Sequence, residues 1–513
     1  MEAGYELEGR CMEGTRQSIL NRIMDWAADP QERNDPPQTN VQWFYGSPGI
    51  GKTSLAHSIC EKLHDRKQLA GAFFCWRDDP YLSEFRNILP TLINSLAGIF
   101  PPFRRLVADR LRNDQNLTSK SMKESLFLDF IRNLPHHPEH SLVFVIDALD
   151  ECDNIRGRLG VMKILTTAAE QVSWLKVIIT SRPEVDIQRF FDSIRPGHSR
   201  YDLARDQEAS ADLQTFAQRQ LGLIASKWYL PMPWPEESLL TKLTSRADGL
   251  FIFIKTVVLS LEHCKDPTET LKTTLQDSAE TGLDSLYRLY SNILRARIAP
   301  GDAEFQRVIG VLLTTAPYRS LCEETIAELA GVRPNLVKKW VDDLSSLLYR
   351  SKGADGTVHI RHLSISHFFI NGDYHSNYQI NLRNANVQLA NACLRTMVNQ
   401  LRFNICKLED SRRANADVKD LQARIKENMT DALQYSTLYW SNHLCFFPDD
   451  DDQCVWEGLK NFLEGLYPLL WIEALSIMGM VPIGVPSIRR VISWAKVSMA
   501  ATRFWFATIP GRF

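Results

Sequence analysis

One short segment combines glycines, a lysine and a threonine at a spacing that suits phosphate binding. Residues 46–53 read Gly-Ser-Pro-Gly-Ile-Gly-Lys-Thr and fit G-x-x-x-x-G-K-[ST] at every fixed position. Glycines let successive backbone N–H groups turn toward an anion, and a following helix points its positive end at the same place. Lys52 can reach the β- and γ-phosphates of a nucleotide, and the Thr53 hydroxyl can hold Mg²⁺. We therefore expect a nucleotide site formed by Gly46, Ser47, Pro48, Gly49, Ile50, Gly51, Lys52, Thr53 and Ser54.

Acidic residues follow a second, fully apolar segment. Residues 142–151 read Leu-Val-Phe-Val-Ile-Asp-Ala-Leu-Asp-Glu. A strand that ends in a carboxylate would place Asp147 beside the glycine loop, where it can hold Mg²⁺ through water. Asp150 and Glu151 lie just beyond the strand, near enough to orient an attacking water, and Glu151 is the favoured base. Plain capping of a helix N-terminus is the structural alternative for this cluster.

A third polar group ends another apolar run. Residues 177–183 read Val-Ile-Ile-Thr-Ser-Arg-Pro. An arginine at a strand tip beside a Mg²⁺ site can pair with a γ-phosphate through its planar fork of donors. We therefore expect Arg182 to sense the nucleotide, with a structural salt bridge as the alternative.

Apolar runs and helical patterns alternate in the first 205 residues. Strands are expected at 41–45, 71–76, 142–147 and 175–180, and helices between them at 53–62, 84–99 and 158–171. Such alternation predicts a parallel sheet covered on both faces. The strand before the glycine loop and the helix after it are the context that a phosphate site requires, which disfavours an accidental glycine loop.

Beyond residue 205 the pattern becomes helical. Helices are expected at 207–221 and 236–245, separated by a proline-rich connector at 231–235, and an apolar helix is expected at about 247–264. This predicts a small helical module beside the sheet.

A different rhythm follows in residues 283–370. Helices at 283–299, 303–313, 322–329 and 334–348 precede a turn at 353–356 and an alternating segment, which suggests a winged-helix shape. From about 377 the chain is helical again. The acidic run 449–452 lacks the spaced ligands of a calcium loop, so we interpret it as a solvated loop.

The composition excludes several classes of protein. The 513 residues include 59 Lys and Arg against 61 Asp and Glu, so net charge gives no reason to expect nucleic-acid binding. The 10 cysteines form no C-x-x-C pair and suggest free thiols in a reducing compartment. The N-terminus does not look like a signal peptide, and prolines and Glu473 disfavour a membrane span in the apolar stretch 466–486. A cytoplasmic location is therefore expected.

The three polar segments together resemble the NACHT branch of the STAND (signal-transduction) P-loop ATPases. The segment Arg-Cys-Met-Glu-Gly-Thr-Arg at 10–16 is similar to the element that precedes the glycine loop in fungal, NLR-like members. Residues 283–287, 361–369 and 433–444 resemble the post-helical, winged-helix and helical-arm elements of that branch. The resemblance therefore extends over about residues 8–480.

The resemblance implies a fold and a set of contacts. It implies an α/β P-loop NTPase core with strand order 5-1-4-3-2, followed by a helical lid, a winged-helix module and an all-α arm, with ATP or ADP enclosed. Lys52 and Thr53 would hold phosphate and Mg²⁺, Asp147 the metal, and Arg182 would act as sensor. Thr15 and Arg16 would approach the base or ribose. His362 would contact the β-phosphate of ADP, and a satisfied histidine at a strand end is its alternative.

The implied boundaries are a lead-in helix in 1–40, the nucleotide-binding core in 41–205, the lid in 206–278, the winged-helix module in 279–375 and the arm in 376–513. The sequence departs from the family at Ala148, at Gly249-Leu-Phe and at His367. We recognise no N-terminal effector domain and no C-terminal repeat sensor in it.

These features favour an ATP/ADP-gated switch that self-associates on exchange for ATP and hydrolyses ATP slowly with Mg²⁺. A separate effector or sensor protein would be its partner. An interaction scaffold with a residual nucleotide site and a P-loop phosphotransferase acting on a small molecule remain alternatives. DNA binding by the winged helix is disfavoured, because its candidate recognition helix offers two lysines beside two aspartates.

Overall fold

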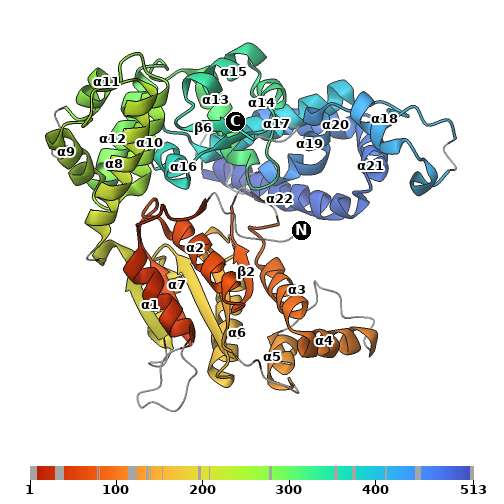
Figure 1. Ribbon diagram of the computed structural model, residues 1–513. Coiled ribbons are helices and arrows are strands. Elements are labelled where there is room, and N and C mark those ends of the chain that lie inside the picture. The colour runs from red at the N-terminus through yellow and green to blue at the C-terminus, as the bar shows by residue number, and fades with distance from the viewer. Residues whose placement is uncertain are drawn as a thin grey trace. The chain divides into compact units, whose positions relative to one another are not determined.

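The computed structural model forms two compact units, Met1–Leu289 and Tyr290–Phe513 (Figure 1). The acidic run up to residue 451 and the tip of the expected turn at 353–355 lie outside the described residues. The structure describes residues 9–28, 40–77, 79, 81–113, 124–134, 138, 140–152, 154–194, 198–206, 208–276, 280–351, 356–371, 377–410, 413–444 and 452–508.

A five-stranded parallel sheet forms the centre of the first unit. Its strands are β1 (Val41–Tyr45), β2 (Leu69–Phe74), β3 (Leu142–Asp147), β4 (Leu175–Ser181) and β5 (His198–Asp202). The order across the sheet is β2-β3-β4-β1-β5. This is the predicted order 5-1-4-3-2 counted from the other edge, so the predicted P-loop NTPase core is confirmed.

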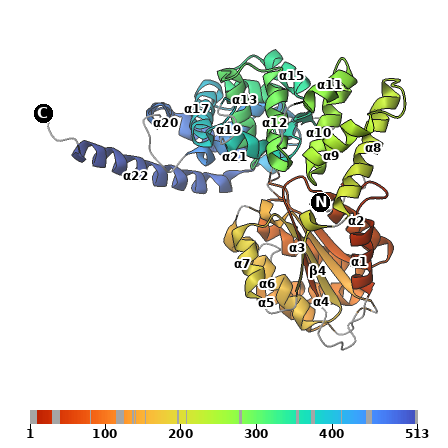
Figure 2. The ribbon, with the colours of Figure 1, turned by 90° about the vertical axis from the view of Figure 1, so that its left-hand side faces the viewer.

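Side chains alternate between the two faces of the sheet, as the two-residue period of a strand requires. Trp43 and Phe144 belong to one hydrophobic core, whereas their neighbours Phe44 and Val143 belong to the other. The first core also contains residues of α3, α4, α5, α6 and α7, and the second contains residues of α1 and α2, so helices cover both faces of the sheet (Figure 2). The helices that precede or connect these strands are α1 (Gln17–Ala28), α2 (Lys52–Asp65), α3 (Ile88–Ile99), α4 (Pro101–Asn113), α5 (Glu124–Arg132), α6 (Ile155–Gln171) and α7 (Val185–Ser193).

Two details of the sheet differ from the sequence-based expectation. The second strand ends at Phe74 rather than at Trp76, and the Cys75 N–H donates to the Asp147 carbonyl (3.0 Å) as the chain leaves the sheet. The edge strand β5, His-Ser-Arg-Tyr-Asp, has no apolar run and was not located from the sequence.

In the described part of the first unit, four complete helices follow the sheet. The third of them begins after Asp248 (φ 45°) and Gly249 (φ 82°), whose left-handed conformations end the preceding helix and turn the chain sharply. These helices lie where the sequence predicts helices, and the apolar helix starts a few residues later than predicted. Its helices are α8 (Ala209–Lys227), α9 (Glu237–Ala247), α10 (Phe251–Glu262) and α11 (Pro267–Thr274).

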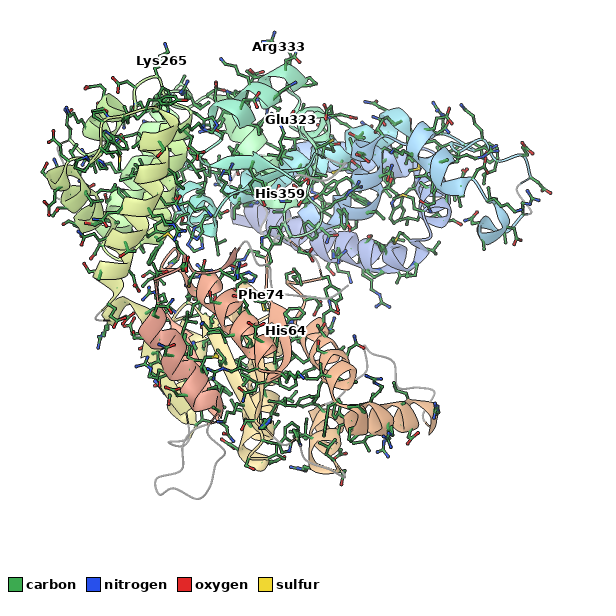
Figure 3. The ribbon with its side chains drawn as sticks, in the orientation of Figure 1. His64, Phe74, Lys265, Glu323, Arg333 and His359 are labelled. Carbon is green, nitrogen blue, oxygen red and sulfur yellow. The ribbon has the colours of Figure 1, made fainter. Side chains whose placement is uncertain are left out.

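The second unit begins within α12 (Gly282–Arg295) and contains the expected order of helices and a hairpin. The hairpin strands β6 (Leu348–Arg350) and β7 (Val358–Ile360) are antiparallel. Arg350 donates to Glu323 on α14 (2.6 Å), which links the hairpin to the helices. The His359 ring stacks on Tyr349. Glu323 and His359 are labelled in Figure 3. The helices around the hairpin are α13 (Ala303–Thr315), α14 (Glu323–Ala330), α15 (Pro334–Asp343) and α16 (Leu363–Ile370).

The rest of the second unit is helical. The elements are α17 (Leu382–Gln400), α18 (Leu421–Asn428), α19 (Asp431–Tyr439), α20 (Asp452–Glu464), α21 (Tyr467–Ile477) and α22 (Gly484–Thr508). Among the helices that the structure describes, we find none with the length and apolarity needed to cross a membrane.

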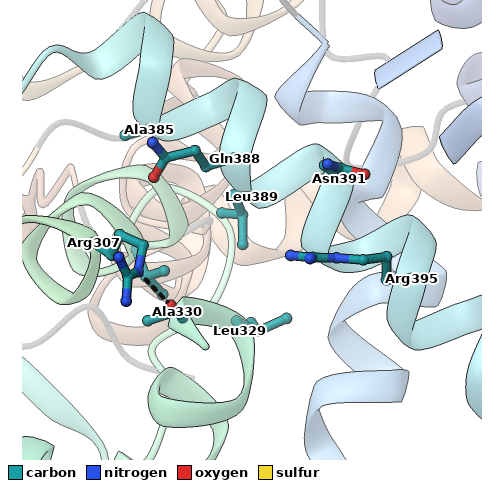
Figure 4. Close-up of a pocket in the computed structure, with 9 residues that line it drawn as sticks. Arg307, Leu329, Ala330, Ala385, Gln388, Leu389, Asn391 and Arg395 are labelled. Atoms are coloured by element: carbon teal, nitrogen blue, oxygen red, sulfur yellow. Dashed lines mark hydrogen bonds between the residues drawn. The ribbon is translucent and has the colours of Figure 1, made fainter. Parts of the chain in front are cut away.

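A small cavity of about 120 Å³ lies between α13, α14 and α17 (Figure 4). Arg307 donates to the Ala330 carbonyl at the C-terminal end of α14 (2.9 Å) and thereby satisfies one of the free carbonyls of that helix end. No residue lining this cavity belongs to the expected nucleotide site.

Candidate functional site

The glycine loop connects β1 to α2, as the sequence predicts. Gly49 (φ 84°) and Gly51 (φ 96°) have left-handed backbones, a conformation that side chains with a Cβ seldom adopt. Lys52 is the first residue of α2 and Leu55 donates to the Gly51 carbonyl (3.0 Å), so the helix begins directly at the end of the loop. The positive end of α2 therefore faces the loop.

Lys52 lies folded over the loop. Its ammonium donates to the carbonyl oxygens of Gly46 (2.8 Å) and Ser47 (3.0 Å). Burial lowers the pKa of Lys52, while the nearby carboxylates of Asp150 and Asp147 oppose that shift. Phosphate oxygens are stronger acceptors than neutral carbonyls, so the ammonium can exchange its loop contacts for a bound phosphate.

Asp147 ends β3 and lies among hydroxyl groups. The Thr180 hydroxyl donates to its carboxylate and accepts from the Ala148 N–H (3.0 Å), and the Thr53 hydroxyl also bonds to the carboxylate. Burial raises the pKa of Asp147 to about 6, although Thr180, Thr53 and Lys52 act in the opposite direction. The structure therefore brings the two predicted metal ligands, Thr53 and Asp147, together.

This pair suits Mg²⁺, which is usually held by one or two protein oxygens together with phosphates and water. In the described part of the chain no group of three or more His, Cys, Asp or Glu could hold a metal by itself. The remaining ligands of a magnesium ion would therefore come from the nucleotide and from water.

Arg182 and Asp150 form a buried ion pair. The Arg182 Nε donates to Asp150 Oδ2 (2.6 Å), and its backbone N–H donates to Oδ1 (2.8 Å). Burial raises the pKa of Asp150, but Arg182 outweighs it, so the pKa lies below its usual range. Arg182 thus forms a structural salt bridge in this structure, which was the alternative to its predicted role as a nucleotide sensor. A role toward the γ-phosphate stays a prediction.

Breaking this pair should destabilise the first unit. Replacement of Arg182 by methionine leaves Asp150 buried without its partner, and we expect the free energy of unfolding to fall by about 3 kcal/mol. The matched control is Arg200→Met, because Arg200 pairs with Asp192 at the same 2.6 Å distance but with side chains 33% and 64% exposed. That change should cost less than about 1 kcal/mol. Equal urea midpoints for the two variants would contradict a stabilising role for the buried pair.

Glu151 lies one residue beyond this pair in a different environment. Burial raises its pKa to about 7, and the neighbouring charge of Asp150 adds to the shift. Its Oε2 accepts from the backbone N–H of Arg77 (3.1 Å), which follows β2. Arg77 was not predicted from the sequence. Because β2 and β3 are paired up to Phe74 and Asp147, the segments that follow the two strands lie close together.

Two buried thiols lie beneath the acidic cluster. The sulfurs of Cys75 and Cys152 are 3.5 Å apart. Burial raises the pKa of the Cys75 thiol well above its usual range, and the nearby carboxylates act in the same direction. Buried thiols with a raised pKa are poor nucleophiles, so the Cys75 thiol is unsuited to nucleophilic chemistry. Cys152 lies buried in the same hydrophobic core.

Thr15 and Arg16 are both buried before α1. The Thr15 hydroxyl donates to the Met12 carbonyl (2.7 Å), and the Arg16 guanidinium donates to the Ile50 carbonyl of the glycine loop (3.1 Å). Arg16 therefore contacts the glycine loop itself, by a hydrogen bond to its backbone. Proximity of either residue to the base or ribose stays a prediction.

The start of α10 also touches the loop, which the sequence did not indicate. The Ile252 N–H donates to the Gly49 carbonyl (3.2 Å), and the Phe251 ring lies 3.8 Å from the position that a Cβ of residue 51 would occupy. The helical module and the phosphate loop are thus in direct contact within the first unit.

His362 belongs to the second unit and has a local structural role. It is the N-cap of α16: its Nδ1 accepts from the Ser364 N–H (3.1 Å) and hydrogen-bonds the Ser364 hydroxyl (2.7 Å). This is the satisfied histidine at a strand end that the sequence offered as an alternative. Contact with a β-phosphate stays a prediction.

One family model and several solved structures are similar to parts of this chain. Residues 14–182, which include β1 to β4, match the family model described as Nephrocystin 3, N-terminal. The chain is by fold a P-loop NTPase, and this match is consistent with the NACHT/STAND class that the sequence resembles. No curated protein matches the chain significantly.

Several solved structures are also similar to the chain. A STAND protein with a tetratricopeptide repeat sensor from Pyrococcus horikoshii is 13% identical, with a TM-score of 0.40, over 97% of this chain and 66% of that one. A Walker-type ATPase of Pyrococcus abyssi is 14% identical, with a TM-score of 0.33, over 71% and 98%. The Orc1 protein of Aeropyrum pernix, solved in complex with DNA, is 12% identical, with a TM-score of 0.31, over 71% and 94%. These scores are too low to carry a conclusion.

Proposed function

We propose that this protein is an ATP/ADP-binding switch of the NACHT/STAND type that acts in cytoplasmic signalling, in responses of the innate-immunity or self-recognition kind. The observation that carries the proposal is the contact of the lid with the phosphate loop. The Ile252 N–H of α10 holds the Gly49 carbonyl, in the same loop that presents Lys52. A change in the loop on nucleotide binding therefore acts directly on the helical module.

The residues at the loop have separate tasks in this proposal. The backbone N–H groups and Lys52 bind the β- and γ-phosphates, because they place positive charge at the start of α2. Thr53 and Asp147 would hold Mg²⁺, which supplies charge neutralisation between the phosphates. Glu151 orients a water and accepts its proton, so that bound ATP is hydrolysed slowly.

Switching would follow from the difference between the two nucleotides. A ligand shifts a conformational equilibrium only by the difference in its affinity for the two states. With ADP bound, we expect the lid to stay on the loop. With ATP bound, contacts of the additional phosphate would compete with those of the lid, and a surface for self-association or for a separate effector or sensor protein would be released.

The proposal is tested by binding and by assembly state. Titration of the purified chain with ADP and ATP in the presence of Mg²⁺ should show saturable binding of both nucleotides. Light scattering after gel filtration should then show a larger species with ATP or a non-hydrolysable analogue than with ADP. Binding without any change of mass would favour the scaffold alternative, and the absence of binding would exclude the switch.

Hydrolysis should depend on pH through Glu151. A general base must be ionised, and burial raises the pKa of Glu151 to about 7. Below that pH the carboxyl is protonated and cannot accept a proton from water, so kcat/KM for ATP hydrolysis, which reports the pKa values of the free protein, should rise between about pH 6 and pH 8. Phosphate release measured across this range checks the prediction, and a flat profile would assign the base to another group.

A further inference from the structure

Arg16 joins the phosphate loop to the lid through several strong contacts. Its side chain is 3% exposed. Its guanidinium donates to the Ile50 carbonyl (3.1 Å) and to the Asp206 carboxylate (2.7 Å), and its backbone N–H donates to Asp212 Oδ2 (2.9 Å). Asp206 precedes α8 and Asp212 lies in its first turn. One residue therefore holds both a loop carbonyl and the start of the lid.

The first residues of α10 complete this arrangement. The guanidinium of Arg16 lies 5.5 Å from the centre of the Phe251 ring, and Ile252 donates to Gly49. Two successive loop residues, Gly49 and Ile50, thus accept hydrogen bonds from the start of α10 and from Arg16. A Cβ at position 51 would lie 3.8 Å from the Phe251 ring. The relevant helices α1, α2, α8 and α10 all belong to the first unit (Figure 1).

The backbone of Arg16 is itself constrained. Its φ of 57° lies in the left-handed region, which residues other than glycine rarely adopt. Its carbonyl accepts from the Leu20 N–H (3.0 Å), so Arg16 caps the start of α1. Hydrogen bonds at both the N–H and the carbonyl hold the backbone of Arg16 in place. The side chain therefore starts from a fixed position, which favours the contacts of its guanidinium.

The contact with Ile50 has a consequence for phosphate binding. The Ile50 carbonyl and the Gly51 N–H are the two ends of one planar peptide group. A donor that holds the carbonyl therefore fixes the direction of the N–H, which is one of the groups available to a phosphate in this loop. Arg16 can orient this N–H without touching the nucleotide.

We propose that Arg16 is a positioning residue that couples the orientation of the Gly51 N–H to the lid and thereby sets the rate at which nucleotide leaves. This inference rests on the proposed nucleotide site. Arginine suits the task because its fork reaches the loop carbonyl and the Asp206 carboxylate together, whereas a lysine has one charged nitrogen for both.

The chain offers a matched control for this arginine. Arg219 on α8 and Glu13, shortly before α1, also join these two parts of the unit, at 4.0 Å. Their side chains are 56% and 91% exposed, and exposed pairs contribute little. Arg219→Gln removes the same charge from the same junction and should leave nucleotide release unchanged.

The test measures release of a fluorescent ADP analogue from the chain with Mg²⁺. We expect about tenfold faster release from Arg16→Gln, because charge-assisted bonds to the loop and the lid are lost. Arg16→Lys and Asp206→Asn should give smaller increases, and Arg219→Gln should match the parent. Thermal unfolding of each variant shows whether the fold is kept. If Arg16→Gln does not fold, the comparison of Asp206→Asn with Arg219→Gln decides the question.

A second measurement separates failure of this inference from failure of the proposed function. Hydrogen exchange of the loop peptide in the nucleotide-free chain needs no ligand. Faster exchange in residues 46–54 and at the start of α10 in Arg16→Gln would support the coupling even if ADP does not bind. Unchanged exchange, or unchanged ADP release from a folded Arg16→Gln protein, would overturn it.

Discussion

Replacing Lys52 by alanine should weaken binding of ADP and ATP by at least about a hundredfold, because charge-assisted bonds to the phosphates are lost. In the structure the Lys52 ammonium already lies at the loop, where it donates to two carbonyl oxygens that a bound phosphate would replace as acceptors. Calorimetric titration with each nucleotide measures the loss directly. The same comparison can be made on the purified proteins by chromatography of the nucleotide released on denaturation.

The control for this change is Lys62→Ala. Lys62 lies in the last turn of the same helix, α2, and is remote from the loop. The Lys62→Ala protein should bind nucleotide as tightly as the parent, and the Lys52→Ala and Lys62→Ala proteins should unfold at similar temperatures. Equal affinities of Lys52→Ala and the parent would place the nucleotide elsewhere and refute the site.

Glu151→Gln has the second large expected effect, on turnover rather than on binding. An amide cannot accept the proton of the attacking water, and loss of a general base typically slows a reaction by roughly a hundredfold or more. Binding of ATP should be kept, because Glu151 is held by the Arg77 backbone and not by the loop. We therefore expect a variant that holds ATP and remains in the ATP-bound assembly state.

The measurement combines single-turnover hydrolysis with nucleotide affinity. Glu170→Gln provides the control, because Glu170 is an exposed glutamate near the end of α6. It should hydrolyse ATP like the parent. A Glu151→Gln protein with an unchanged rate would show that the proton goes to another group, and one that no longer binds ATP would show that Glu151 is structural.

Much of the sheet could be predicted because its central strands are buried on both faces. Residues 142–146 are a continuous apolar run and residues 175–179 are apolar apart from Lys176, and the structure places β3 and β4 within one residue of the predicted bounds. The edge strand β5 has no such run, since an edge strand needs fewer apolar side chains. Helix ends were the other weak point: the helix expected at 334–348 ends at Asp343, where the chain turns toward the hairpin.

The candidate site was predicted in part. The spacing of residues 46–53 and the carboxylate at the end of β3 indicated Lys52, Thr53 and Asp147, because this combination of residue types is typical of a nucleotide and Mg²⁺ site. The ion pair of Arg182 with Asp150 was an alternative that sequence alone could not decide. Arg77 and Ile252 make their contacts through backbone N–H groups. Nearly every residue type has such a group, so these contacts could not be predicted from the sequence.

The glycines of the phosphate loop imply an uneven tolerance to mutation along six residues. At Gly49 and Gly51 the left-handed backbone penalises every residue with a Cβ, whatever its size. At Gly46 the obstacle is space, because a Cβ would lie 3.2 Å from the Ile50 side chain. Ile50 is buried in the hydrophobic core, whereas Ser47 and Pro48 meet neither restriction. In a saturation library selected for nucleotide binding, accepted substitutions should therefore concentrate at positions 47 and 48, and the glycine positions should stay unchanged.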